Sequence, residues 1–189
     1  VSTRPFWRYE QVQQGRFREF YQTNVDIFGS TEPTADAEIL AFAADALTGL
    51  GLSGKDFEFR VSHRDILGEL FRSFDADVDV RDAVRAVDKR EKIERGEYLG
   101  LLSDAGLSYD QAKSFDELVT GGNLDEIADF GGSEVEAAVT NLRNVLDAAA
   151  DFGADEFCEV SLTTARGLDY YTGVVFECFD STGEVSRSV

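Results

Sequence analysis

The sequence lacks methionine altogether and contains one histidine and two cysteines. Cys158 and Cys178 are too few for a disulfide framework and do not have metal-ligand spacing, so we interpret both as buried strand residues. No run of about 18 apolar residues and no signal-peptide pattern occurs, which predicts a soluble, cytoplasmic protein with no membrane partner. A chain without methionine that begins with valine is typical of an internal piece of a longer protein.

Basic residues are scarce: 37 Asp and Glu against 18 Lys and Arg give a net charge of -19. Only four basic residues are lysines, at positions 55, 89, 92 and 113. Such charge repels itself in dilute salt, and screening shortens the reach of that repulsion to about 3 Å at 1 M salt. The acidic residues spread along the chain, and an apolar content of 43% excludes a disordered acidic segment. We expect a halophilic source, an ordinary acidic protein being the alternative.

The hydrophobic periodicity changes along the chain from strand to helix and back. Residues 6–28 predict a long β-hairpin around the break at 11–16, residues 36–50 an amphipathic helix, and residues 57–61 a short strand. Helical patterns follow at about 64–74, 80–95, 97–104, 110–118 and 133–152. Strand patterns return at 157–163 and 174–179. This order predicts an α+β fold, an antiparallel sheet with a flanking helix, interrupted by a helical insertion domain over 63–154 between sheet parts at 1–62 and 155–189.

Three short motifs imitate known sites, and the sequence argues against each. Residues 49–56, GLGLSGKD, have a helix before and a strand after, the reverse of a phosphate-binding loop, so we expect a helix C-terminal turn. Residues 75–80, DADVDV, lack the glycine and the later acid of a calcium loop, which favours a solvated acidic loop. His63 has no nucleophile motif or second metal-binding histidine near it, so we expect a helix-start residue. We therefore predict no protein-bound metal.

The basic residues of the expected 80–95 helix recur at helical spacing. They are Arg81, Arg85, Lys89, Lys92 and Arg95. On one helix they would form a basic face suited to RNA, and in so acidic a chain a polyanion would bind there. Local ion pairs with the neighbouring acidic residues are the alternative, each stabilising a helix by about 0.2 to 0.5 kcal/mol.

The hairpin carries more polar and aromatic side chains than a structural sheet requires. Because residues two apart share a face of a strand, Arg18, Phe20, Gln22, Asn24 and Asp26 would line one surface. Arg8 and Glu10 would approach from the partner strand. Guanidinium groups suit a phosphate, an aromatic ring a base, and an amide with a carboxylate an ammonium group. The pattern predicts a site for a zwitterion beside a nucleotide.

Two segments resemble the histidyl-tRNA synthetase family of class II aminoacyl-tRNA synthetases. Residues 7–22, WRYEQVQQGRFREFYQ, are similar to its motif 2, and residues 166–177, RGLDYYTGVVFE, are similar to its arginine-containing histidine-binding motif. The resemblance covers the whole chain and is weakest across the insertion. It implies a reaction of histidine with ATP, which carries Mg²⁺ as a co-substrate, to form histidyl-adenylate, and then transfer of histidine to tRNA(His).

The resemblance also implies roles for residues. The ATP-binding residues would be Arg8, Glu10, Arg16 and Phe20. The histidine-binding residues would be Gln22, Asp26, Arg166, Tyr170 and Tyr171. Arg8 would hold the α-phosphate, and Arg166 would stabilise the charge that grows there as the carboxylate attacks, so these two are the expected catalytic residues.

Within those sets the resemblance assigns finer contacts. Glu10 and Phe20 would face and stack the adenine, and Arg16 would reach the outer phosphates. Gln22 and Asp26 would bind the substrate ammonium. Tyr170 and Tyr171 would line the imidazole pocket.

The resemblance further implies a homodimer for the full-length protein. Motif 1, the upstream histidine-binding loop, the segment leading to motif 3 and the anticodon-binding domain do not occur in these residues. We therefore expect this piece alone not to aminoacylate. A histidine-sensing regulatory paralogue that acts on ATP phosphoribosyltransferase is the alternative, and the presence of both arginines, Arg8 and Arg166, favours the enzyme.

Overall fold

The structure is a computed structural model that describes residues 1–9, 11–12, 17–74, 77–121, 123–164 and 172–182. Strands β1 (Ser2–Trp7) and β2 (Glu19–Asn24) come first, followed by helix α1 (Pro33–Gly49) and strand β3 (Phe57–His63). Five helices follow: α2 (Arg64–Arg72), α3 (Val80–Val87), α4 (Arg95–Asp104), α5 (Tyr109–Gly121) and α6 (Leu124–Asp151). A short 3-10 turn (Asp155–Phe157) then leads to β4 (Cys158–Val160) and β5 (Val174–Asp180).

The strands form two separate sheets, and the α+β class is confirmed. β1 and β2 pair antiparallel as the expected hairpin, whose first strand begins at Ser2 rather than near residue 6. In the second sheet β3 is central, antiparallel to β5 and parallel to β4. The parallel pair departs from the antiparallel sheet that we expected. Parallel neighbours need a long crossover, and the helices α2 to α6 between β3 and β4 supply it.

The hydrophobic core joins this sheet to the helices. Phe57, Phe59 and Val61 of β3 are buried, and the Phe57 ring stacks on Phe157 with ring centroids 5.0 Å apart. The core extends without interruption into α1 and into the helices between β3 and β4, where Phe115 of α5 is fully buried. The strand residue Cys158 is half-buried rather than fully buried, as is Cys178, and both thiols are free.

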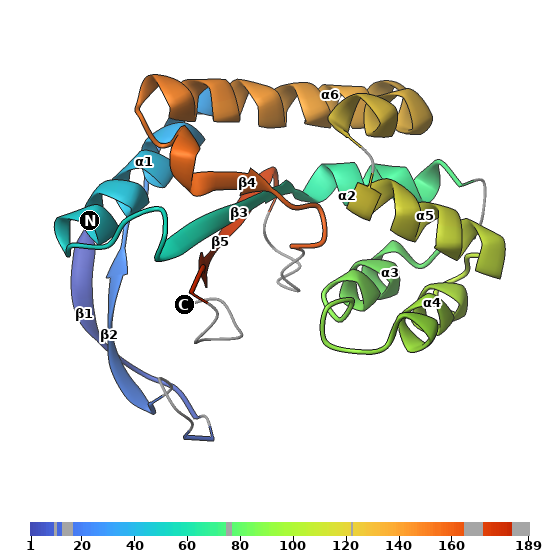
Figure 1. The fold of residues 1–189 in the computed structure, drawn as a ribbon, viewed down its shortest axis with the longest axis horizontal. Coiled ribbons are helices and arrows are strands. Elements are labelled where there is room, and N and C mark those ends of the chain that lie inside the picture. Colours follow the sequence, from blue (N-terminus) through green and yellow to red (C-terminus); the bar gives the residue numbers. More distant parts are fainter. Residues whose placement is uncertain (10, 13–16, 75–76, 122, 165–171, 183–189) are drawn as a thin grey trace.

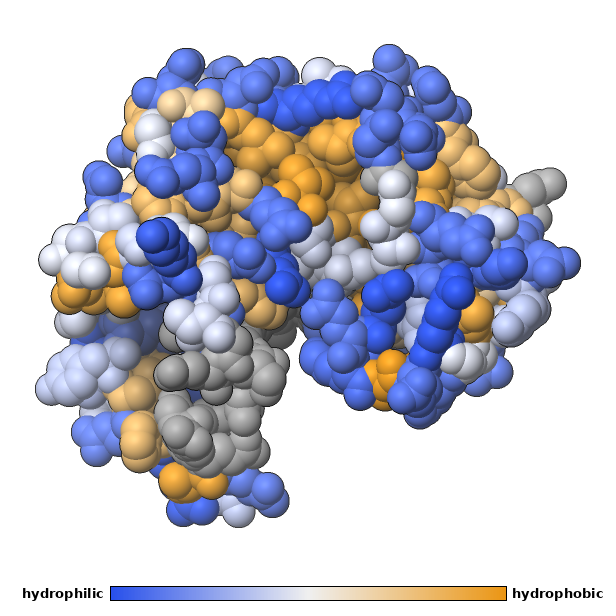
Figure 2. Space-filling model, in the orientation of Figure 1, coloured by the Kyte–Doolittle hydropathy of each residue, from blue (hydrophilic) through white to orange (hydrophobic). Residues whose placement is uncertain are grey.

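Helix α6 connects α1 with α2, because it packs on both of these helices. Figure 1 shows α6 running along one side, the hairpin β1–β2 projecting at one end, and α3, α4 and α5 gathered at the other end. Hydrophilic side chains cover most of the face in Figure 2, while hydrophobic ones gather beneath α6. None of the helices in the described ranges is both long enough and apolar enough to cross a membrane.

Two of the expected helices differ from those observed. The predicted helix over 80–95 is wrong: α3 ends at Val87, and α4 begins at Arg95. The helix expected over 133–152 is the second part of α6, which begins at Leu124 with Asn123 capping it through hydrogen bonds from the Asp125 and Glu126 amides. Gly132, with φ 75°, interrupts it, since a positive φ is favourable for glycine alone.

A candidate active-site face on the hairpin

The register of the hairpin decides which side chains share a face. Phe6 pairs with Phe20, and Arg4 pairs with Gln22. One residue beyond the last pair, the Arg8 amide donates to the Arg18 carbonyl at 2.9 Å. Because strand residues alternate between faces, Arg8, Phe20 and Gln22 lie on one side. The predicted shared face is confirmed for these three residues.

Arg8 makes two contacts that fix its guanidinium. Its Nη2 donates to Gln22 Oε1 at 3.3 Å, and its Cζ lies 4.9 Å from the centroid of the Phe20 ring. The Phe20 ring also stacks with Phe6 at 6.3 Å. A cation over an aromatic ring contributes about 0.5 to 1 kcal/mol at an exposed site. The expected phosphate-binding arginine and the expected adenine-stacking ring are therefore in contact.

The amide of Gln22 has a defined orientation. Its Oε1 accepts from Arg8, and its Nε2 donates to Asn24 Oδ1 at 2.5 Å. Gln22 and Asn24 are half-buried, whereas Asp26 is exposed two residues beyond the end of β2. The hydrogen bond to Asn24 was not anticipated, although the i, i+2 spacing of two amides on one strand face is the signal that would have indicated it.

The other predicted site residues of the two motifs lie outside the described residues. They are Glu10, Arg16, Arg166, Tyr170 and Tyr171. Their roles stay predictions. Within the described ranges, no group of three or more His, Cys, Asp or Glu side chains is arranged to hold a metal ion.

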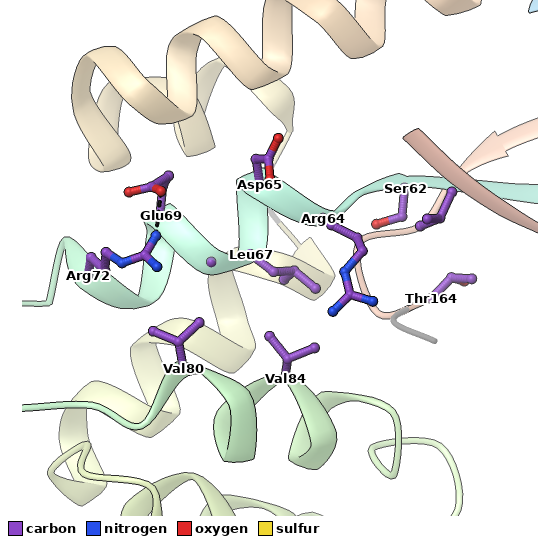
Figure 3. A pocket seen from close by; sticks show the side chains of 11 residues that line it. Ser62, Arg64, Asp65, Leu67, Glu69, Arg72, Val80, Val84 and Thr164 are labelled. Atoms are coloured by element: carbon purple, nitrogen blue, oxygen red, sulfur yellow. Dashed lines mark hydrogen bonds and ion pairs between the residues drawn. The ribbon is translucent and has the colours of Figure 1, made fainter. Parts of the chain in front are cut away.

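A cavity of about 170 Å³ lies between the end of β3, α2 and α3. Ser62 and Arg64 line it from one side, and Val80 and Val84 of α3 close the other side. Figure 3 shows the Arg64 guanidinium reaching between Val84 and Thr164. Thr164 also lines the cavity and is the last described residue before the motif at 166–177. One wall of the cavity is therefore close in sequence to that motif.

The five basic residues predicted to contact RNA do not form one helical face. Arg81 and Arg85 lie on α3, Lys89 and Lys92 lie in the turn after it, and Arg95 begins α4. The chain turns because helix α3 ends at Val87, so the spacing that suggested a single stripe spans two helices and a turn.

Arg85, Lys92 and Arg95 form ion pairs. Arg85 pairs with Asp82 at 3.1 Å, and Lys92 pairs with Asp88 at 2.9 Å. Arg95 Nε donates to Asp116 Oδ2 at 2.8 Å. The alternative of local salt bridges is thus observed, and contact with RNA stays a prediction.

The Arg95 contact belongs to a wider cluster around a buried carboxylate. Asp116 is 1% exposed and accepts from Arg90 Nε at 2.7 Å as well as from Arg95. Hydrogen bonds to both guanidinium groups compensate the cost of burying this carboxylate. The cluster ties the turn after α3 and the start of α4 to α5.

One of the weak motifs, at 49–56, has the structure that we expected. Residues 49–56 form the turn between α1, which ends at Gly49, and β3, which begins at Phe57. DADVDV lies partly outside the described residues, and its Asp79 caps α3 by accepting from the Asp82 amide. The segment at 49–56 thus has a helix before it and a strand after it, the reverse of a phosphate-binding loop.

His63 is the N-cap of α2, as predicted. Its Nδ1 accepts from the Asp65 amide at 3.3 Å, so the ring proton is on Nε2, which donates to Asn141 Oδ1 at 3.2 Å. Burial lowers the pKa of His63, and the nearby Asp65 and Asp36 carboxylates and the Asn141 hydrogen bond oppose that effect only in part. The neutral ring therefore connects β3, α2 and α6 through these hydrogen bonds.

The buried imidazole of His63 predicts a pH dependence of stability. Because the folded pKa of His63 is below its ordinary value of about 6.5, the unfolded chain binds the proton more tightly, and stability falls as the pH drops below that value. In His63→Asn the new side chain still caps α2, and the free energy of unfolding should change less between pH 7.5 and 5.5. Denaturant unfolding at constant KCl measures how the free energy of unfolding changes with pH in the unaltered protein and in the variant. An equal change with pH in both proteins would contradict the assignment of this pH dependence to His63.

The architecture matches two solved structures. A structure described as an ATP phosphoribosyltransferase regulatory subunit/histidyl-tRNA synthetase from Bacillus halodurans superposes with a TM-score of 0.77, at 21% identity, over 98% of this chain and 48% of that chain. Histidyl-tRNA synthetase from Nostoc sp. PCC 7120 superposes with a TM-score of 0.74, also at 21% identity, over 96% of this chain and 43% of that one. This chain therefore shares the fold of these two structures.

The sequence comparisons are more specific. The histidyl-tRNA synthetase family model matches residues 2–187. Histidine–tRNA ligases from Haloquadratum walsbyi and Halorubrum lacusprofundi are 74% and 72% identical to this chain, each over 100% of this chain and 44% of the relative. The chain belongs to the histidyl-tRNA synthetase family. It spans less than half the length of these curated relatives, whose sources are halophilic archaea, as the acidic composition predicted.

Proposed function

We propose that this chain forms the part of a histidine–tRNA ligase that binds ATP and histidine. The observation that carries the proposal is the contact of Arg8 with both Phe20 and Gln22 on one hairpin face. These are the residues to which the family resemblance gives the α-phosphate, the adenine and the substrate ammonium. Membership of the family supports the same reading.

The proposed first step is displacement at phosphorus. A carboxylate oxygen of histidine attacks the α-phosphorus of ATP, the new bond gives histidyl-adenylate, and pyrophosphate leaves with the electron pair of the broken bond. Such a step depends on positioned cations more than on a general base. A guanidinium has five N–H donors, so Arg8 keeps donors for the phosphate while one bonds Gln22. Mg²⁺ would arrive with ATP and neutralise phosphate charge.

The remaining assignments extend this site. Glu10 and Arg16 would contact the adenine and the outer phosphates, while Asp26 would join Gln22 at the ammonium. Tyr170 and Tyr171 would hold the imidazole. In a chain with net charge -19, the guanidinium groups of Arg8 and Arg16 would supply local positive charge for the phosphates.

Arg166→Ala is expected to slow adenylate formation more than it weakens histidine binding. The proposed guanidinium stabilises charge that develops only in the transition state, and loss of one such donor costs about 100- to 1,000-fold in rate. Single-turnover formation of histidyl-adenylate gives the rate, and a histidine titration gives the affinity. An equal loss of both would argue against a transition-state role.

The partners of the second step are histidine's tRNA and, for the full-length protein, a second copy of the chain. The proposed tRNA contacts lie at the end of the molecule away from the hairpin (Figure 1). They are the five basic residues predicted from the sequence: Arg81, Arg85, Lys89, Lys92 and Arg95. Phosphate contacts release counterions, so this part of the affinity should fall steeply with salt. A cytoplasmic site of action accords with the proposed substrates.

A histidine-sensing regulatory role is the second candidate, because one of the matching structures carries that description. Histidine-dependent exchange of labelled pyrophosphate into ATP separates the two. A protein that contains this sequence and has the full length of its relatives should catalyse the exchange in molar KCl. Histidine binding without any exchange would replace the ligase proposal with the regulatory one.

A further inference from the structure

The hydrogen bonds on the hairpin face run in one direction. Arg8 can only donate, because a guanidinium has no acceptor, so the group of Gln22 that faces it must be the carbonyl Oε1. The Gln22 Nε2 then points the other way and meets Asn24 Oδ1 at 2.5 Å. The direction of these two hydrogen bonds follows from the chemistry of Arg8, the first donor.

The same direction determines what Gln22 can offer to a ligand. An amide oxygen has two lone pairs, and Arg8 uses one of them. Asn24 takes one of the two Nε2 hydrogens and holds Nε2 away from Arg8, so the end of the Gln22 amide that faces Arg8 offers an acceptor. An acceptor suits an ammonium group, whereas a reversed amide would present a donor and repel it.

We infer that Asn24 is a positioning residue, whose Oδ1 holds the Gln22 amide so that Oε1 accepts from the substrate ammonium. The inference rests on the proposed function, since it concerns the ammonium of histidine. Asn24 is half-buried at the end of β2, opposite Ser2, where the paired strand limits its movement. Its side chain acts through Gln22 and is not assigned a contact with the substrate.

The test replaces Asn24 in the protein that carries this sequence at the full length of its relatives. Asn24→Leu removes the acceptor and should raise the KM for histidine in pyrophosphate exchange about 3- to 10-fold, the loss expected for one hydrogen bond. The KM for ATP should change less, because Arg8 keeps its contact with the Phe20 ring. Asn24→Asp retains an acceptor and should restore the KM for histidine.

Thr23→Val is the matched control. The Thr23 hydroxyl also makes a side-chain hydrogen bond, to Thr3 at 2.9 Å, but on the opposite face of the same strand. It should leave both KM values unchanged. If Asn24→Leu and Thr23→Val behave alike, or if Asn24→Leu raises both KM values equally, Asn24 merely supports the hairpin and the inference is overturned.

Failure of the proposed function is distinguishable from failure of this inference. If the unaltered protein shows no histidine-dependent exchange, the proposed function is wrong and the inference falls with it. If the unaltered protein is active and Asn24→Leu has the same KM for histidine, the inference alone is wrong.

Discussion

Arg8→Ala is expected to lower kcat/KM for histidine-dependent pyrophosphate exchange by about 100- to 1,000-fold. The substitution removes the guanidinium that Gln22 and the Phe20 ring hold in place, and with it the cation proposed to bind the α-phosphate. Because the arginine is oriented before substrate binds, little of its effect is lost to reorganisation. Steady-state exchange kinetics in molar KCl measure the change.

Arg8→Lys should recover little of this loss. Lysine keeps a positive charge but has neither the planar fork that bonds phosphate at two points nor the flat face that packs on Phe20. Arg143→Ala is the control, since it removes an exposed arginine of α6 that pairs with Asp125. Near-normal activity in Arg8→Ala would contradict the proposed role, as would full recovery in Arg8→Lys.

Phe115→Ala is expected to destabilise the chain by about 3 to 5 kcal/mol. Its ring is fully buried, stacks on Phe71 of α2 with centroids 4.1 Å apart, and lies 6.1 Å from Phe74. Alanine would leave a cavity where α2 and α5 meet. Urea unfolding in constant KCl, followed by circular dichroism, gives the change in the free energy of unfolding.

The control for this substitution makes the same change on the surface. Phe28 is 90% exposed, so Phe28→Ala should alter the free energy of unfolding by less than about 0.5 kcal/mol. A similar cost for both variants would show that the Phe71–Phe115 stack is not a core contact. A cost for Phe115→Ala below about 1 kcal/mol would lead to the same conclusion.

Regular periodicity made much of this fold predictable. The two-residue period of the hairpin placed Arg8, Phe20 and Gln22 on one face, and the register confirms it. The apolar spacing of α1 and the apolar strand β3 were sufficient to locate both elements. Local patterns succeed for α1 and β3 because both bury apolar residues in the core.

The errors arise where distant parts of the chain decide the local structure. The 80–95 pattern suited one helix, but Asp116 in α5 bonds both Arg90 and Arg95, an arrangement that a local pattern does not reveal. The parallel pairing of β3 with β4 also depends on how the intervening helices return the chain. At the site, side-chain spacing identified the face, whereas the direction of the Gln22 amide depends on its contacts with Arg8 and Asn24 in the folded hairpin.

We propose that these residues contain part of an active site selective for histidine. Calorimetric titration of the 189-residue chain in molar KCl, with a non-hydrolysable histidyl-adenylate analogue, tests it most directly. We expect saturable binding that is weakened by Arg8→Ala and is lost when the analogue carries alanine instead of histidine. A folded chain that binds neither analogue, or both equally well, would contradict it.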